Sequence, residues 1–162
     1  MSAASGYAYL SDGRHFENLG LYEMALRRCR RIIIVGDRPV EKTPILDDLS
    51  KSILQINIDL GLRVVVDQSE KNLVTGRILY SEIDRDAPDG QFIYLAPVVY
   101  RTEYESVDQL SSDLQFEIYR LLGLRMIDDI FQGREARVSS VAEFFEIVDF
   151  YLNPGPPPVR TV

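Results

Sequence analysis

Glycine is spaced in this sequence in a way that excludes three common site motifs. The chain has 162 residues and 10 glycines, and no two glycines are two, four or five positions apart. A G-x-S-x-G nucleophile elbow, a G-x-G-x-x-G dinucleotide loop and a Walker A phosphate loop each require one of these spacings. None of the three motifs can therefore form within these residues.

Cysteine and histidine are each present once, as Cys29 and His15. A single cysteine excludes an internal disulfide, and one residue of each kind falls short of a zinc ligand set, so we expect neither a metal nor a cofactor. Arginines on both sides of Cys29 favour a reactive thiolate. The alternative, which we prefer, is a packed cysteine near a helix end, because free cysteines are usually buried.

Basic residues are outnumbered by acidic ones, 18 to 25, which gives a net charge of −7 at pH 7. A chain of this charge is repelled by phosphate backbones, so we expect no nucleic acid partner. Long apolar runs are also missing, since the longest aliphatic run, Ile32–Val35, is far shorter than a membrane span. The first residues lack the basic and apolar regions of a signal peptide, so a cytoplasmic location is expected.

The composition is that of a globular protein, 46% hydrophobic and 27% charged, at the length of about one domain. Apolar residues recur at steps of three and four over several segments, as they do along one face of a helix. Ile32–Val35 is a continuous β-branched run, which is typical of a strand buried on both faces. The expected strands are 7–11, 32–35, 62–67, 73–80 and 91–97, and the expected helices are 16–29, 46–60, 106–123 and 138–152.

This order of elements predicts an α/β fold. Residues 7–67 alternate as β-α-β-α-β, which favours a parallel core with right-handed crossovers. The two later strands are close together in sequence and predict an antiparallel meander at the sheet edge, followed by C-terminal helices. The acidic segment 84–90 departs from the calcium-loop pattern and is interpreted as a hairpin turn. Gly61 is expected to cap the second helix.

Residues with catalytic potential lie near the first predicted turn. Asp12 and Gly13 follow the first predicted strand, at the sheet edge where α/β proteins build their sites, and Asp12 can serve there as a general base. An Asx turn before a helix is the alternative role for Asp12. His15 has the same two interpretations, structural or catalytic. The arginines that surround Cys29 suit either a helix C-terminus or an anionic lipid surface.

The segment Leu10–Glu23 has the sequence LSDGRHFENLGLYE and is followed by an arginine-rich stretch and a β-branched strand that leads to Asp37. This combination resembles the C-terminal part of bacterial patatin-like phospholipases, whose members carry an S-D-G-G-H-F-E-N-L-G-like segment in the same context. The resemblance covers about residues 7–125. Further segments similar to the family are NIDLG at 57–61, TGRILY at 75–80, FIYLAP at 92–97 and FEIYRLLG at 116–123.

The resemblance implies a serine–aspartate dyad on a three-layer patatin-like fold, of which this chain would hold a part. The family's aspartate activates a serine in G-x-S-x-G for attack on an ester carbonyl. That aspartate corresponds to Asp12, while Gly13, His15 and Asn18 belong to the supporting motif. The implied substrate is a lipid or acyl ester, with no cofactor. Arg14 departs from the family pattern, which has a small residue there, and its charge favours an ionised Asp12.

Two hypotheses follow for the chain as a whole. In the first, it is the C-terminal half of a patatin-like acyl hydrolase, inactive alone because the serine elbow is missing from the sequence. Residues 1–125 would then belong to the patatin-like domain, 126–152 to a helical extension and 153–162 to a proline-rich tail. In the second, it is a non-catalytic α/β interaction or remnant module. Peripheral membrane contact through the arginines and self-association through an unpaired sheet edge are further expectations.

Overall fold

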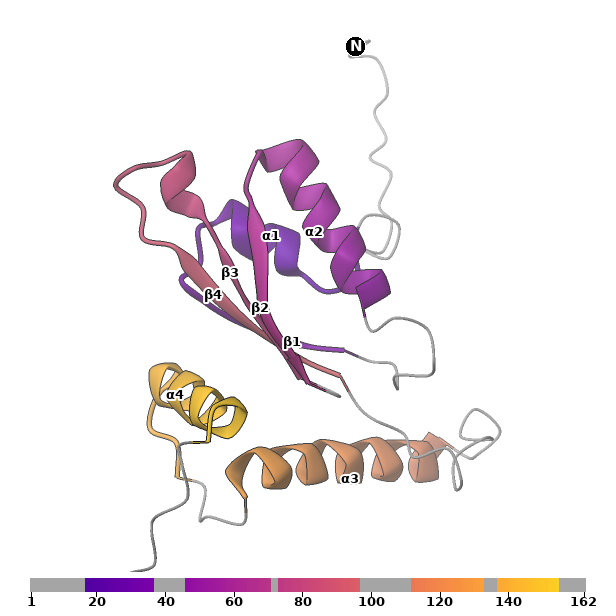
Figure 1. The fold of residues 1–162 in the computed structure, drawn as a ribbon. Helices are drawn as coiled ribbons and strands as arrows, with labels where there is room; N and C mark the ends of the chain where they lie inside the picture. Colours follow the sequence, from indigo (N-terminus) through magenta and orange to yellow (C-terminus); the bar gives the residue numbers. More distant parts are fainter. Residues whose placement is uncertain (1–16, 37–45, 71–72, 97–111, 133–136, 155–162) are drawn as a thin grey trace, which may run out of the picture.

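The computed structural model describes residues 17–36, 46–70, 73–96, 112–132 and 137–154 (Figure 1). These ranges contain a four-stranded sheet with helices on both faces, so the expected α/β class is confirmed. The elements in chain order are α1 (Leu21–Leu26), β1 (Arg31–Val35), α2 (Leu46–Leu60), β2 (Val64–Glu70), β3 (Leu73–Ile78), the 3-10 turn η2 (Tyr80–Glu82), β4 (Gly90–Leu95), α3 (Ser112–Phe131) and α4 (Val141–Leu152).

The sheet is mixed, and its strands follow the order β1-β4-β3-β2. β1 pairs with β4 in parallel, whereas β2, β3 and β4 form an antiparallel meander. The predicted antiparallel strands β3 and β4 are therefore present. They lie between β1 and β2, however, and not at the edge of the sheet. β1 and β2 still point in the same direction, as the β-α-β pattern predicts. The long connection through α2 leaves room for the two strands that separate them.

Different helices cover the two faces of the sheet. α1 and α2 pack on one face, where Ile34, Ile56 and Phe92 belong to one buried cluster. The end of α3 and the whole of α4 pack on the other face, over Leu73 and Ile93. Figure 1 shows these two helical layers on opposite sides of the sheet. Successive strand residues point to opposite faces, so neighbours such as Phe92 and Ile93 serve different clusters.

α2 has the bounds that its apolar periodicity predicts. Leu49 and Ile56 are fully buried against the sheet. Gly61 follows the helix with a φ of 64°, and its N–H donates to the carbonyl oxygen of Asn57. A residue with a side chain would be strained in this left-handed conformation, so the predicted glycine cap is confirmed.

α1 is shorter than the predicted helix 16–29. It begins after Gly20, whose φ is 72°, and ends before Arg28, whose φ is 57°. Neither conformation can continue a right-handed helix. Leu19 belongs to the apolar repeat that predicted the longer helix, and it packs on the first cluster from outside the helix. The periodicity therefore identified the buried side chains correctly and the helix start incorrectly.

The prediction that strand 32–35 is buried on both faces is wrong. Ile32 and Ile34 are buried beneath α1 and α2, whereas Ile33 is 42% and Val35 is 67% exposed. The cause is the position of the second helical layer. Its buried cluster includes residues of β3 and β4 but none of β1.

α3 continues through Gly123 to Phe131, so the predicted end of this helix at residue 123 is wrong. A glycine inside a helix costs about 1 kcal/mol relative to alanine and does not have to end it. The predicted apolar face is also open to solvent within the described structure, since Leu114 is 48% and Leu121 is 51% exposed. Burial of α3 begins at Met126. The helix passes the predicted domain boundary at residue 125 without a break, and the division itself stays a prediction.

Two predicted segments lie outside the described residues: the first strand, 7–11, and nearly all of the proline-rich tail. Among the described helices, none combines the length and the apolar character needed to cross a membrane. The sheet and its two helical layers are therefore the framework on which the described candidate sites are built.

Candidate functional site

The residues of the aspartate motif fall largely outside the described part of the chain. Asp12, Gly13 and His15 precede residue 17, where the description begins, so their roles stay predictions. Asn18 is described: it is exposed and lies in the bend that leads into α1. The structure therefore defines the end of the motif.

Glu17 fixes this end of the motif to α2. Its Oε1 accepts hydrogen bonds from the backbone N–H groups of Leu19 (2.9 Å) and Leu21 (3.4 Å), which lie at the start of α1. The same oxygen accepts a hydrogen bond from the hydroxyl of Ser52 in α2, at 2.6 Å. Ser52 is 2% exposed, so this contact is part of the core. Sequence spacing gives no sign of it, because the two side chains are 35 positions apart.

The arginines after α1 have separate contacts. Arg27 pairs with Glu23 one helical turn earlier, at 2.6 Å. The guanidinium of Arg28 lies 5.3 Å from the centre of the Tyr80 ring, within the range of a cation–π contact. Arg31 begins β1 and lines a groove on the other side of the sheet. The helix-end interpretation therefore accounts for the first two of these arginines.

Cys29 is a packed cysteine, as predicted. It is half-buried, and its Sγ lies 3.7 Å from Sδ of Met24. Its carbonyl oxygen accepts a hydrogen bond of 3.0 Å from the hydroxyl of Tyr80. Burial raises the pKa of Tyr80 to about 12. This buried network is structural, and it fixes the chain between α1 and β1 on η2.

The segment between β3 and β4 is a turn, as predicted for 84–90. Oδ1 of Asp89 accepts a hydrogen bond from the backbone N–H of Ser81, at 3.0 Å. This bond holds the pKa of Asp89 below its usual range. Within the described ranges, no group of three or more His, Cys, Asp or Glu side chains is arranged to hold a metal ion.

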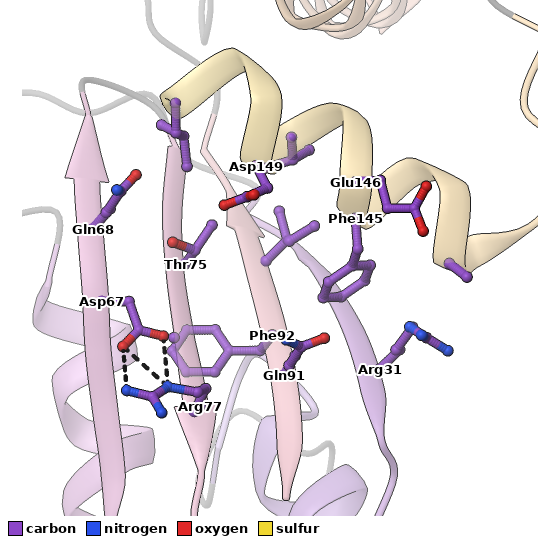
Figure 2. Close-up of a pocket in the computed structure, with 15 residues that line it drawn as sticks. Arg31, Asp67, Gln68, Thr75, Arg77, Gln91, Phe92, Phe145, Glu146 and Asp149 are labelled. Carbon is purple, nitrogen blue, oxygen red and sulfur yellow. Dashed lines mark hydrogen bonds and ion pairs between the residues drawn. The ribbon is translucent and has the colours of Figure 1, made fainter. Parts of the chain in front are cut away.

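A groove of about 480 Å³ lies between α4 and the sheet (Figure 2). α4 is held over the sheet by Val148, which is 1% exposed, and by a hydrogen bond of 2.8 Å from the Gln68 amide to Asn153. Cavities of this size accommodate small organic molecules. The groove combines residues of all four strands with residues of α4. Local sequence patterns therefore cannot reveal it.

Polar side chains from three strands share one register row on the sheet side of the groove. Arg31 of β1 is paired with Gln91 of β4, which is paired in turn with Arg77 of β3. Neighbouring strands are about 4.8 Å apart, so the Gln91 amide stands between the two guanidinium-bearing residues. Arg77 is bound by Asp67 through contacts of 2.9 to 3.1 Å, which hold the pKa of Arg77 above its usual value. Arg31 forms no ion pair with the other groove residues (Figure 2).

The opposite wall of the groove is acidic. α4 contains three acidic residues and no basic one. The carboxylate of Glu143 accepts hydrogen bonds from the N–H and the hydroxyl of Ser139, just before the helix starts. Glu146 and Asp149 line the groove, and the ring of Phe145 points from α4 toward the sheet (Figure 2). The groove thus has carboxylates on its helix side, and on its sheet side it has the guanidinium of Arg31 together with the ion pair of Arg77 and Asp67.

The fold and this groove define a mixed α/β protein with a charged cleft beneath its last described helix. Comparison of the chain with protein-family models, with curated proteins and with solved structures finds no match.

Proposed function

We propose that the chain supplies the aspartate side of a patatin-like lipid acyl hydrolase. Asp12 would be the base, and the nucleophilic serine would come from polypeptide outside these 162 residues, since no G-x-S-x-G is present among them. The observation that carries the proposal is the SDGRHFENLG segment followed by a helix, an arginine-rich turn and a strand. The described end of this segment, with α1 and β1 after it, has that order of elements.

The contacts of Glu17 support the proposal from the structure. Its carboxylate ties the end of the motif to both α1 and α2. A catalytic base must be held within a fraction of an ångström of its working position, and rigid elements do this better than loops. A motif whose last residues are bound to two helices meets that requirement on its C-terminal side.

In the proposed reaction, the serine Oγ forms a bond to the acyl carbon while Asp12 accepts the serine proton. The ester bond then breaks, and the proton passes from Asp12 to the leaving oxygen. Water attacks the acyl-serine in the second half, with Asp12 accepting and returning a proton in the same way. A lipid ester substrate would bring the assembled enzyme to a membrane surface from a cytoplasmic location.

The nucleotide sequence upstream of Met1 provides the first test. The proposal expects an in-frame stretch that encodes G-x-S-x-G, and a promoter with a ribosome-binding site directly before Met1 would contradict it. The protein translated from the longer frame should hydrolyse a short-chain nitrophenyl ester. Asp12→Asn should abolish this activity, whereas Asp128→Asn, an exposed position on α3, should leave it unchanged.

The chain of 162 residues by itself gives a second readout. A fluorophosphonate probe, which reacts with activated serines, should leave it unlabelled because the nucleophile is missing. Labelling would show that a serine within this sequence is activated and would overturn the assignment of roles.

A non-catalytic interaction module is the second candidate function, and α3 is the observation that favours it. Phe116 is 69% and Leu124 is 50% exposed on this helix, so the part of α3 before Met126 has apolar side chains without a cover in the described structure. Exposed apolar surface of this kind is typical of protein–protein contacts. Under this hypothesis, no serine-bearing segment exists upstream and a full-frame hydrolase cannot be assembled.

A further inference from the structure

We propose that the groove between α4 and the sheet binds a small zwitterion, with a phosphate or carboxylate group a few bonds away from an ammonium group. The opposite charges of the two walls carry this assignment. On the sheet side Arg31 has no ion pair with another groove residue, because Asp67 pairs with Arg77, and Glu146 and Asp149 belong to α4. None of these residues is part of the motif around Asp12, so the inference is independent of the proposed hydrolase.

The anionic end of the ligand would bind on the sheet side. Arg31 is exposed and has no carboxylate partner in the groove, so its guanidinium is available for a ligand. The amide of Gln91, beside it in the register, adds a second donor. Guanidinium groups form strong, charge-assisted hydrogen bonds to phosphate and carboxylate oxygens. Arg77 is neutralised by Asp67 and serves as the far wall of this half of the site.

The ammonium end of the ligand would bind beneath α4. Glu146 and Asp149 both line the groove, with Glu146 at the end where Arg31 lies and Asp149 nearer to Gln68 (Figure 2). Asp149 uses Oδ1 to accept a bond from Asn153, and its Oδ2 stays available. The ring of Phe145 points into the groove between these carboxylates and the sheet (Figure 2). An aromatic face near carboxylates attracts an ammonium group by both Coulomb and cation–π forces.

A ligand of one charge matches this groove less well. An anion on Arg31 would face the carboxylates of Glu146 and Asp149, and a cation beneath α4 would face Arg31. Arg31 and Glu146 line the same groove without forming an ion pair, so each keeps its charge for a third group. A zwitterion of a few bonds' length satisfies both walls at once.

Nuclear magnetic resonance titration of the labelled full chain tests the site directly. The probes are phosphoethanolamine, inorganic phosphate and ethylamine, that is, the zwitterion and its two halves. Phosphoethanolamine should shift the backbone amide signals of Arg31, Gln91 and Glu146 and should bind at least about tenfold more tightly than either half. Equal binding of phosphate alone, or shifts confined to residues outside the groove, would overturn the proposal.

Variants test the two walls separately. Arg31→Gln and Glu146→Gln should each weaken phosphoethanolamine binding about tenfold, the usual effect of losing one charge-assisted contact. Arg85→Gln, in the exposed turn before β4, and Asp128→Asn, on α3, change charge elsewhere and should bind as the unaltered protein does. Unaltered binding by Arg31→Gln would overturn the proposal. The comparison of the three probes needs no variant, so it stands even if a substitution disturbs folding.

Both free metabolites and lipid headgroups can be zwitterions of this kind. Binding of the protein to lipid vesicles distinguishes between these two sources of the ligand. If phosphatidylethanolamine vesicles retain the protein and soluble phosphoethanolamine releases it, the ligand is a headgroup. If the soluble compound binds in the groove and the vesicles do not retain the protein, the ligand is a free zwitterion.

Discussion

Ser52 donates a hydrogen bond to Glu17 across 35 positions of the chain, with 2.6 Å between Oγ and Oε1. The bond joins α2 to the segment that leads into α1, and it lies in the core because Ser52 is 2% exposed. The same carboxylate oxygen also accepts the N–H groups of Leu19 and Leu21. Glu17 therefore links the start of α1 to α2, beside the packing of Leu21 and Ala25 in the core.

Glu17→Ala should lower the free energy of unfolding by roughly 1–3 kcal/mol, because it removes the acceptor of two amide groups and leaves the buried Ser52 hydroxyl with only the carbonyl oxygen of Asp48, at 3.0 Å. Ser52→Ala removes the hydroxyl that is shared between Glu17 and the carbonyl oxygen of Asp48 and should cost about 1 kcal/mol. Urea unfolding followed by circular dichroism measures both. Ser50→Ala, at an exposed position of the same helix, is the control and should stay within about 0.5 kcal/mol of the unaltered protein. A cost for Ser52→Ala no greater than that of the control would contradict the role assigned to Glu17.

Gly76 and Gly123 should respond to alanine in opposite directions. A Cβ at position 76 would collide with the ring of Phe92 and with the carbonyl oxygen of Val65. Gly76→Ala should therefore destabilise the protein by roughly 1–3 kcal/mol. A Cβ at position 123, inside α3, meets no atom within 4 Å, so Gly123→Ala should stabilise the helix by about 0.5–1 kcal/mol. Thermal and urea unfolding of both variants give the signs, and a neutral Gly76→Ala would be the unexpected result.

Stability at alkaline pH should depend on Tyr80. Burial raises the pKa of its hydroxyl from 10.0 to about 12, and the hydroxyl donates to the carbonyl oxygen of Cys29. The unfolded chain loses this proton at lower pH than the folded chain does. The contribution of Tyr80 is thus complete below about pH 10 and is lost as the pH rises through about 12.

The urea midpoint of the unaltered protein should therefore fall across this pH window. Tyr80→Phe should lower the midpoint at neutral pH, since it removes a hydrogen bond, and should flatten the alkaline decline. Tyr119→Phe changes a tyrosine that is 39% exposed and should keep the original profile. Parallel profiles for Tyr80→Phe and the unaltered protein would show that Tyr80 does not cause the decline.

Local sequence patterns predicted the parts of the fold whose causes are local. The apolar repeat of α2 and its cap at Gly61 depend on residues within one helix, so their bounds agree with the structure. The exposure of Ile33 and the continuation of α3 past Gly123 depend on what packs against them. That information lies in distant segments, above all in where the second helical layer meets the sheet.

The same distinction holds for the sites. The Asp12 motif is contiguous, so a resemblance could identify it, although most of it lies outside the described residues. The groove is different, because Arg31 and Gln91 become neighbours only through the parallel pairing of β1 with β4. Composition and periodicity do not specify that pairing, since the β-α-β pattern suits several strand orders. The charged walls of the groove therefore emerge from the structure alone.

Self-association is the last expectation that the described surface makes testable. Val35 is 67% exposed near the end of β1, and β1 lies at one edge of the described sheet. An apolar edge strand favours pairing with a second copy, and a lysine on it opposes such pairing. The average mass in sedimentation velocity should rise with protein concentration, and Val35→Lys should reduce that rise. Leu54→Lys, at a position of α2 that is 58% exposed, should leave it unchanged. If the protein is monomeric at every concentration, the prediction is wrong. If Val35→Lys associates as much as the unaltered protein does, the copies do not pair through this edge.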